Sequence, residues 1–450
     1  MQASRRRLLR ATGLAPLAAA LPAALAGRAG DDLAVPTPAG PAERLARDEA
    51  HWGRVARLYD VTRDVAQLDN GFFGSMARAT MARYQDALQQ VNHGNAYFAR
   101  QDYPAVHRKL AGTLAAALGV GADEIVLTRG ATEALQALIG GYNRLRPGDA
   151  VLHADSDYDS MITAMRWLHR RRGVDVVSID LPLRPGRQQI LDTYAKALRD
   201  HPRVRMMLLT HVSHRNGLVL PVRELTEMAR ASDVDVIVDA AHSWGQLDFK
   251  LPELGADFAG INLHKWIGAP VGTGALYIRK PRIEDIDPYM GEPDPHGSVH
   301  ARVHTGTANF AAYMALPTAL DLHQRIGPAH KEARVRYLRD RWVDQARDLP
   351  GLEILTPEDP ALHGAITSFR LQGQTSVDAN QALARRLQDE FGVFTVHRTG
   401  LASGACVRAT PAVFTLVDEV DRLAKALRAV VAATVTKSPF RSIAPGARSQ

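Results

Sequence analysis

Short apolar runs alternate with amphipathic stretches through the middle of the chain. The runs are bounded by turn residues and predict five strands, with helical patterns of about 12 to 15 residues between most of them: Glu124–Thr128, Ala150–Ala154, Val174–Ile179, Arg205–His211 and Val234–Asp239. Two more strands, Phe258–Asn262 and Gly274–Arg279, follow with no room for a helix between them, so one strand pair is expected to be antiparallel. This alternation is typical of an α/β domain whose sheet is mostly parallel.

The pattern changes near residue 316. Helix-rich sequence, two strand patterns and two further helical patterns follow one another at 317–349, 353–355, 365–371, 379–391 and 417–435. We therefore expect a large domain with an N-terminal segment over 46–315, a smaller C-terminal α+β domain over 316–437, and a tail over 438–450. The length of 450 residues agrees with two domains, because ~150 residues is usual for one.

The first residues resemble a twin-arginine (Tat) export signal. A serine and three arginines precede a weakly hydrophobic, Ala-rich stretch, and Ala24–Ala26 fits an A-x-A cleavage site. Arg10 and Pro16 interrupt the apolar run, which falls short of the ~20 clean residues of a membrane span, so no stable membrane insertion is expected. We expect a signal over 1–26, a linker over 27–45, and a protein exported folded to the periplasm by the Tat machinery. An arginine-rich cytoplasmic N-terminus and a membrane anchor are the alternatives.

Composition excludes some classes of partner. The formal charge is +7, and removing the four arginines of the expected signal leaves +3, which is too small to indicate nucleic-acid binding. The single cysteine, Cys406, excludes an intrachain disulfide and a CxxC metal site, and no metal is expected.

An acid and a lysine carry the most information about chemistry. Asp239 ends an apolar strand pattern, and Lys265 follows the next strand, 26 residues later. Both side chains can reach the crevice outside the carboxyl ends of the strands, where α/β proteins bind ligands. The pair suits pyridoxal 5′-phosphate (PLP), whose aldehyde needs a lysine for a Schiff base and whose pyridine nitrogen needs an anionic partner. Taken alone, a lysine at a strand end is most often a solvated surface residue.

A turn upstream suits a phosphate group. Gly130, Ala131 and Thr132 follow a strand and open a helix, so backbone N–H groups and the Thr132 hydroxyl can approach a phosphate at the positive helix end. A plain Thr N-cap with a Gly turn is the alternative, but it leaves the acid and the lysine unexplained.

Jointly, the motifs resemble those of the PLP-dependent class V aminotransferases of fold type I, and within them the isopenicillin N epimerase-like branch. The resemblance spans about residues 68–427, and its motifs are Leu68-Asp69-Asn70-Gly71-Phe72-Phe73-Gly74, Gly130-Ala131-Thr132-Glu133, His211-Val212-Ser213, Asp239-Ala240-Ala241-His242, His264-Lys265 and Gly272-Thr273-Gly274-Ala275-Leu276-Tyr277. It implies a large PLP-binding domain with a seven-stranded, mostly parallel sheet, and a small C-terminal α+β domain.

The resemblance also implies residue roles by position. Lys265 forms the Schiff base with PLP, and Asp239 pairs with the pyridine nitrogen. Arg408 receives the substrate α-carboxylate, with Asn70 as a second substrate-binding residue. Thr307 matches a threonine that reaches the phosphate of the partner subunit, which implies a homodimer. The remaining implied contacts are to the phosphate and to the face of the cofactor ring: Ala131, Thr132, Asn262 and His264 for the phosphate, and Tyr158 for the ring.

Two positions depart from the pattern of many class V members. His214 stands where many have an asparagine that binds the pyridine 3′-oxygen, and His242 stands where desulfurases have glutamine. Both are expected to bind the cofactor. Imidazoles can make either bond but can also titrate near neutrality, so whether these residues alter the reaction stays open.

The expected function is that of an exported PLP enzyme acting at the α-carbon of an amino acid or amino-acid-containing secreted metabolite. Aminotransferase-type chemistry comes first, and epimerisation or C–S lyase chemistry is the alternative. Cysteine desulfuration needs a mobile cysteine well before the carboxylate-binding arginine, whereas Cys406 is two residues before Arg408 on one expected strand. The export signal adds a likeness to Tat-dependent periplasmic PLP enzymes that modify the glutamyl side chain of pyoverdine siderophores.

Two other classes of protein are weighed against this expectation. A non-catalytic PLP-binding sensor of this fold usually carries a DNA-binding domain, and no helix-turn-helix pattern follows the signal. A dinucleotide-dependent dehydrogenase needs GxGxxG after its first strand, and Thr128–Glu133 is not that motif.

Overall fold

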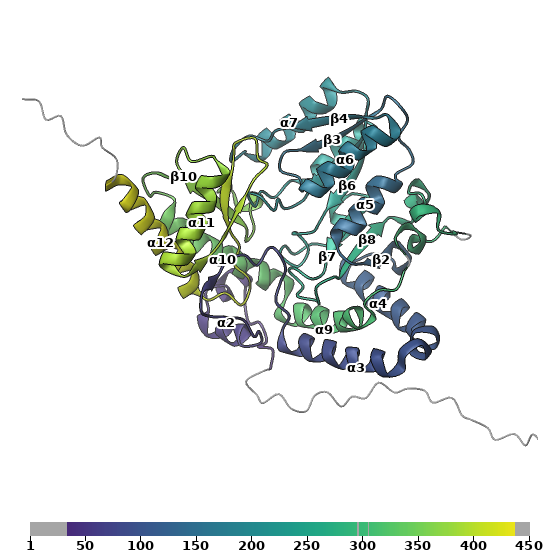
Figure 1. Cartoon of the computed structure of the whole chain (residues 1–450), viewed down its shortest axis with the longest axis horizontal. Helices are drawn as coiled ribbons and strands as arrows, with labels where there is room; N and C mark the ends of the chain where they lie inside the picture. The colour runs from purple at the N-terminus through teal and green to yellow at the C-terminus, as the bar shows by residue number, and fades with distance from the viewer. Residues whose placement is uncertain (1–33, 295–296, 305, 437–450) are drawn as a thin grey trace, which may run out of the picture. The chain divides into compact units, whose positions relative to one another are not determined.

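The computed structural model describes residues 34–294, 297–304 and 306–436 (Figure 1). The expected signal, the first part of the expected linker (27–33) and the expected tail over 438–450 lie outside these residues. Where the linker range ends, helix α1 (Ala42–Leu45) forms, and α2 (Glu49–Ala56) follows it. The buried indole of Trp52 donates to the Leu45 carbonyl at 2.8 Å, which joins the two helices.

A seven-stranded sheet organises the larger part of the fold. Its strand order is β2-β8-β7-β6-β5-β3-β4, and every strand is parallel to its neighbours except β8, which is antiparallel to both β7 and β2. All seven predicted strands are present, with ends within one residue of the prediction: β2 Ile125–Thr128, β3 Ala150–Ala154, β4 Asp175–Ile179, β5 Val204–Thr210, β6 Asp235–Asp239, β7 Phe258–Asn262 and β8 Gly274–Ile278. The predicted antiparallel pair is confirmed as β7 with β8, but a second antiparallel pair, β8 with β2, was not predicted and arises because β8 inserts between these two strands.

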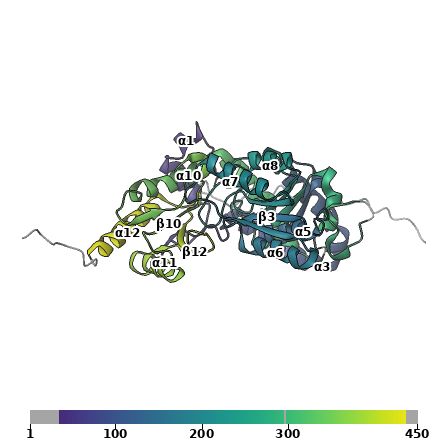
Figure 2. The same ribbon diagram turned by 90° about the horizontal axis from the view of Figure 1, so that it is seen from above.

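Helices cover both faces of this sheet, and Figure 2 shows β3 between them. Successive strand residues face opposite sides, so Leu127 and Val238 pack in one core cluster whereas Val126 and Ile237 pack in another. The second cluster holds α5 (Ala131–Gly141) and α6 (Asp159–Arg172). The first cluster holds the helices of the opposite face: α3 Arg78–Gln101, α4 Tyr103–Leu118, α7 Arg187–Asp200, α8 Val222–Ala231 and α9 Phe310–Ile326.

A four-stranded antiparallel sheet lies in the C-terminal part, with strand order β12-β13-β10-β9. Its apolar side packs with three helices around Trp342 and Phe369. The helix and strand patterns predicted for this region are present, and β13 is the strand expected to carry Cys406 and Arg408, whereas the short strand β12 was not predicted. The bounds are β9 Leu352–Ile354, β10 Thr367–Leu371, β12 Val396–Arg398, β13 Cys406–Ala409, α10 Pro328–Ala346, α11 Val377–Phe391 and α12 Val417–Thr436.

A two-stranded parallel pair joins the N-terminal segment to this second sheet. β1 (Ala66–Gln67) pairs with β11 (Val393–Phe394), and the Leu68 carbonyl accepts the N–H of Thr410 at 2.7 Å. The motif that begins at Leu68 is therefore held beside β13. Short 3₁₀ helices complete the described chain: Ala122–Glu124, Leu251–Leu254, Lys280–Asp285, Tyr289–Gly291, Val299–Arg302 and Pro360–Leu362.

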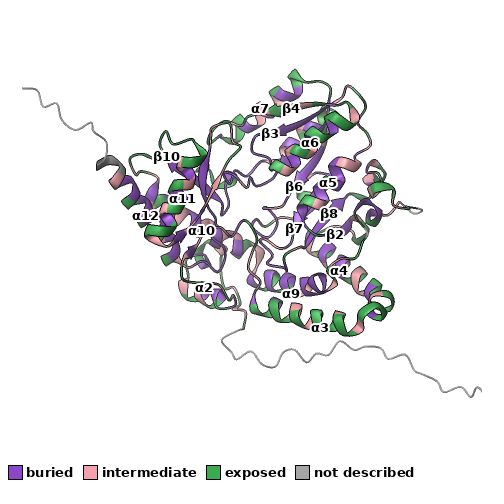
Figure 3. Ribbon diagram, in the orientation of Figure 1, coloured by how far each residue is buried: buried purple, intermediate pink, exposed green. Residues whose placement is uncertain are grey.

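Burial follows these layers, and Figure 3 shows the central strands buried between helices whose outer faces are exposed. Among the described residues, no helix is long and apolar enough to cross a membrane.

Candidate active site

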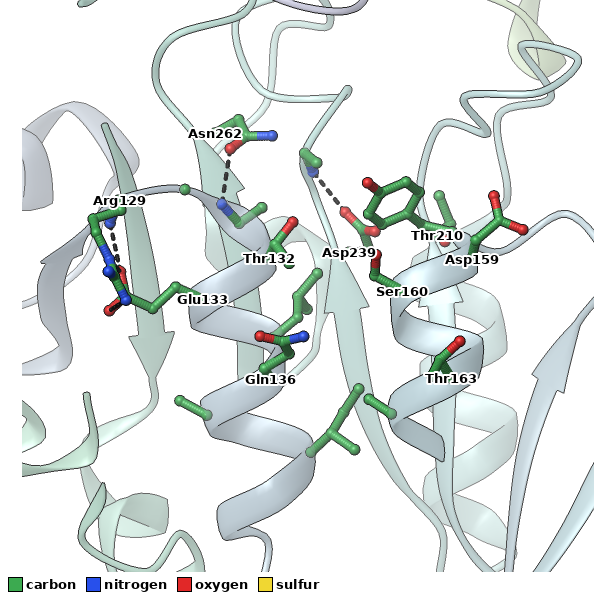
Figure 4. A pocket seen from close by; sticks show the side chains of 18 of the residues that line it. Arg129, Thr132, Glu133, Gln136, Asp159, Ser160, Thr163, Thr210, Asp239 and Asn262 are labelled. Atoms are coloured by element: carbon green, nitrogen blue, oxygen red, sulfur yellow. Dashed lines mark hydrogen bonds and ion pairs between the residues drawn. The ribbon is translucent and has the colours of Figure 1, made fainter. Parts of the chain in front are cut away.

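A cavity of about 1140 Å³ opens at the carboxyl ends of the central parallel strands. Asp239 ends β6, Asn262 ends β7, and Thr132 stands in the first turn of α5. Figure 4 shows these three side chains close to one another. Ten of the twelve residues singled out from the sequence line the cavity: Ala131, Thr132, Tyr158, His214, Asp239, His242, Asn262, His264, Lys265 and Arg408.

Lys265 is the only lysine of the described chain that lines this cavity. Its Nζ lies 2.9 Å from Nε2 of His242. Removal from water lowers the pKa of the Lys265 amine to about 7; the charge of Asp239 opposes that shift, and the charges of Arg408 and Arg398 add to it. A large fraction of Lys265 is therefore a neutral amine at pH 7, which a nucleophile or base requires.

The glycine that ends the first sequence motif lets the chain approach Lys265 closely. The Gly74 N–H donates to the His264 carbonyl at 2.8 Å. A Cβ atom at Gly74 would lie 1.9 Å from the backbone oxygen of Lys265. Any side chain at this position would displace the lysine-bearing segment, so the motif has a direct structural link to the site.

Asp239 is a buried carboxylate with few hydrogen-bond donors around it. Its Oδ1 accepts the Ala241 N–H at 2.9 Å, and its Oδ2 has no hydrogen-bond partner among the described residues. Burial raises the pKa of the carboxyl, whereas the Ala241 N–H and the charge of Lys265 lower it. A cationic N–H donor in the cavity would satisfy the free oxygen and hold the carboxylate ionised.

The N-terminus of α5 offers donors for an anion, although not every expected donor is free. The Ala131 N–H is taken by Asn262 Oδ1 at 2.8 Å, so Asn262 fixes this turn. Thr132 has no hydroxyl partner in the described structure, and N–H groups in the first turn of a helix have no intrahelical acceptor. His264 is held by its Nδ1, 2.7 Å from the Thr273 carbonyl oxygen. The turn is therefore shaped for a phosphate, with Thr132 as its free side-chain donor.

His242, which is buried, the partly buried His214 and Tyr158 form another part of the wall. The rings of Tyr158 and His214 meet edge to face, with centroids 5.2 Å apart and an interplanar angle of 88°. Burial lowers the pKa of both His214 and His242 well below the usual value, so both imidazoles are neutral at pH 7. Each Nδ1 is buried without a partner in the described structure. The histidines can thus bind a group in the cavity, but neither titrates near neutrality.

Arg408 is buried on β13, as is Cys406, which confirms that one strand carries both. Its Nη1 donates to the His214 carbonyl at 2.8 Å, and its Nη2 contacts Asp69 Oδ1. Asn70 does not line the cavity, because its amide donates to the carbonyls of Gln67 and Thr410 and so fixes the chain beside β13.

Thr307 is exposed on the segment before α9 and likewise lies outside the cavity lining. Its expected role toward a partner subunit stays a prediction.

Sequence reasoning missed three residues of the site. Arg398 ends β12 and lines the cavity, Asp69 contacts Arg408, and the exposed ring of Phe72 stands at the cavity wall. Asp69 and Phe72 lie inside a motif that had been singled out, so their proximity to the site could have been foreseen. Arg398 lies on a three-residue strand that gives no periodic signal.

The donor set fits PLP. A neutral lysine, a buried carboxylate with a free oxygen and a helix N-terminus with a free hydroxyl surround one cavity. These are the partners required by the aldehyde, the pyridine nitrogen and the phosphate of that cofactor.

Comparison with known proteins agrees with this chemistry. The family model described as aminotransferase class-V matches residues 75–423. The chain is 29% identical over 405 residues to isopenicillin N epimerase of Streptomyces clavuligerus, a match covering 85% of this chain and 98% of that protein. It is 27% identical to a probable cysteine desulfurase of Xylella fastidiosa (strain Temecula1), covering 64% and 74% of the two chains.

The fold has close counterparts among solved structures. One is a mutant of C-DES with glycine covalently linked to its PLP cofactor, which matches with a TM-score of 0.70 and 23% identity over 81% of this chain and 97% of that one. The fold is that of the type I PLP-dependent transferases. The chain thus belongs to the class-V aminotransferase family, and its cofactor is pyridoxal 5′-phosphate.

Proposed function

We propose that this PLP-dependent enzyme carries out aminotransferase-type chemistry at the α-carbon of an amino acid or of an amino-acid-containing secreted metabolite. The observation that supports this most is the state of Lys265, the only cavity-lining lysine of the described chain, whose pKa is about 7. A base with a pKa near the working pH can both take and return a proton.

Bound PLP supplies an electron sink for the electron pair left when the substrate α-carbon loses its proton. Lys265 takes that proton on its Nζ, and the His242 Nε2 that lies 2.9 Å away keeps the amine in place. The Asp239 carboxylate holds a proton at the pyridine nitrogen, which keeps the sink strong. Thr132 and the first turn of α5 bind the phosphate, and Tyr158 forms the cavity wall beside the pyridine ring of PLP.

Amine transfer needs only one proton-carrying group on one side of the substrate. With PLP bound, Lys265 would both take the α-proton and give it back from the same side of the substrate, so no second acid would be needed. Epimerisation needs an acid on the opposite side, and no residue of the cavity is singled out for that task by its contacts. We place amine transfer first because it needs one proton-carrying residue, whereas epimerisation needs two.

Epimerisation is the second candidate, and one finding favours it. One relative, which matches over 85% of this chain and 98% of its own length, is an isopenicillin N epimerase. In that case Tyr158 or the adjacent His214 would be the second proton carrier, since their rings meet beside the cavity.

Desulfuration through a cysteine nucleophile is less well supported. Cys406 is fully buried on β13 and does not line the cavity. Burial also raises the pKa of its thiol, which disfavours the thiolate. A C–S lyase reaction, in which a β-group leaves after the α-carbon has lost its proton, needs no cysteine nucleophile and is a further alternative.

Product analysis tests the proposed reaction. Purified holoenzyme is incubated with a panel of amino acids and glutamyl peptides, including siderophore peptides with a glutamyl residue whose α-amine is free, and Lys265→Ala serves as the inactive control. Carbonyl products formed together with pyridoxamine phosphate support amine transfer. Products of unchanged oxidation state with inverted configuration contradict it.

Export to the periplasm through the Tat machinery is a separate proposal, and it rests on the signal-like residues 1–26. The Arg5→Lys, Arg6→Lys double variant should stay in the cytoplasm as an active enzyme, because these residues precede the catalytic segment. Recovery of the double variant in the periplasm would contradict export by this route.

A homodimer is likewise proposed, because Thr307 is exposed and free to meet a partner subunit. Sedimentation of the holoenzyme tests it, and a monomer at micromolar concentration would contradict it.

A further inference from the structure

Lys265 stands on a segment that has almost no backbone hydrogen bonds. It lies in the irregular chain between β7 and β8, which forms neither helix nor strand. From Lys265 to Gly268, only the Trp266 carbonyl has a hydrogen-bond partner among the backbone groups of the described chain. A segment of this kind is free to shift unless contacts from elsewhere in the fold hold it. The position of the reacting amine therefore depends on the group that binds the Trp266 carbonyl.

A buried lysine makes that hydrogen bond. Lys331 lies near the start of α10 and is 4% exposed. Its Nζ donates to the Trp266 carbonyl at 2.9 Å and lies 3.0 Å from Nδ1 of His323 on α9. A lysine side chain carries N–H hydrogens whether it is charged or neutral, so this bond does not depend on its protonation state. One side chain thus joins α10 to the peptide that follows Lys265.

The same pair of helices also contacts the chain beside the partner of Lys265. The ring of His323 packs against the ring of Trp244, with centroids 6.0 Å apart. Trp244 lies two residues after His242, whose Nε2 is 2.9 Å from Lys265 Nζ. Lys331 and His323 therefore contact the chain next to both members of the Lys265–His242 pair.

Lys331 has no acidic partner that would explain its burial. Burial alone lowers the pKa of its amine to about 7, and no carboxylate of the described chain opposes that shift. The other titratable groups that act on this cluster are the imidazole of His323 and the ammonium of Lys250. Replacing a buried group of this kind by an apolar side chain is often neutral or stabilising. Stability alone therefore does not account for a lysine at this position.

We propose that Lys331, oriented by His323, is a positioning residue for the reacting lysine. Its hydrogen bond to the Trp266 carbonyl holds the Lys265 segment in place and so keeps the Lys265 amine buried beside His242. Lys331 does not line the cavity, so it acts only through Lys265. The proposal concerns the attachment of PLP to Lys265 and holds whether the enzyme transfers the amine or inverts the α-carbon.

The pH dependence of PLP attachment to the full-length apoprotein tests the proposal, followed by stopped-flow absorbance. Lys331→Met keeps an unbranched side chain and removes the N–H donors. Without the hydrogen bond the segment loosens and water reaches the Lys265 amine, so its pKa rises from about 7 toward 10.5. The pH at which the rate is half of its plateau should rise by at least about one unit. Relative to the plateau, the rate at pH 7 should fall at least about fivefold, because the neutral share of Lys265 falls from about one half to about one eleventh.

Lys250→Met is the matched control. Lys250 also lowers the pKa of His323, which places it near the same cluster, but its Nζ donates to the Ala117 carbonyl and not to the Lys265 segment. This control should keep the wild-type pH midpoint to within about 0.2 unit. If Lys331→Met does not fold, Lys331→Leu decides, because leucine also lacks an N–H donor.

Denaturant titration of the apoproteins separates positioning from a general loss of structure. Lys331→Met should unfold at a denaturant concentration no lower than the wild type. A wild-type pH midpoint in the folded Lys331 variant overturns the proposal, as does an equal rise in the Lys250→Met control. A raised pH midpoint in a variant that unfolds at a clearly lower denaturant concentration also overturns it, because Lys331 would then be a structural residue. Failure of the proposed amine transfer would appear only in the product analysis and would leave these results unchanged.

Discussion

Attachment of PLP to Lys265 should have an unusual pH dependence. The neutral amine is the attacking form, and the pKa of this lysine is about 7 rather than the ordinary 10.5. At pH 7 about half of Lys265 is then neutral, compared with about one part in three thousand for an ordinary lysine. Mixing apoenzyme with PLP should give an attachment rate that is level above about pH 8 and falls roughly tenfold per unit below about pH 6.

The assay is stopped-flow absorbance of the covalently bound cofactor, and a matched control removes the titrations of PLP itself. In Lys265→Ala, added methylamine takes the place of the side chain and has the pKa of an ordinary alkyl amine, above about 10. Its rate should keep rising to about pH 10. A wild-type rate that rises in parallel with this control would refute the inference that burial lowers the pKa of Lys265.

Two further predictions concern buried charges. Asp239→Ala should keep covalent PLP but slow exchange of the substrate α-hydrogen with D₂O by at least about 100-fold, because the preorganised negative charge of the Asp239 carboxylate is lost. Asp239→Asn is the matched variant of equal shape. Exchange at the wild-type rate would count against the pyridine-binding role of Asp239. Lys331 is buried, with Nζ 2.9 Å from the Trp266 carbonyl oxygen and a pKa lowered to about 7 by burial. The unfolded chain keeps this proton up to about pH 10.5 whereas the folded chain loses it near pH 7, so the free energy of unfolding rises with pH between 7 and 10.5. In Lys331→Met the rise in apoprotein unfolding free energy from pH 7 to 9 should be smaller than in the wild type by about 2 kcal/mol. Equal rises in denaturant titrations of the two proteins would contradict the lowered pKa of Lys331.

The central sheet could be predicted from sequence because all of its strands except the edge strand β4 are almost entirely buried. Runs such as Ala150–Ala154 and Phe258–Asn262 are buried throughout and end at turn residues, so the ends of these strands could be predicted from the sequence. The position of β8 between β7 and β2 could not be predicted, since Gly274–Ile278 has the same apolar character whichever neighbours it pairs with. The short strand β12 has too few residues to show a period.

Site residues divide in the same way. Asp239, Asn262 and Thr132 could be placed because each stands at the end of a strand or the start of a helix. The contact of His242 with Lys265 and the pairing of Asp69 with Arg408 depend on segments that are 23 and 339 residues apart, and no local pattern specifies such contacts.

The proton shift at the α-carbon tests the account most directly. The holoenzyme is incubated in D₂O with a single-enantiomer amino acid or glutamyl peptide that it turns over, and the product and the cofactor are analysed together by NMR and mass spectrometry. We predict a carbonyl product, with pyridoxamine phosphate accumulating and deuterium at its C4′ methylene carbon. Deuterium at the α-carbon with inverted configuration and no carbonyl product would contradict it.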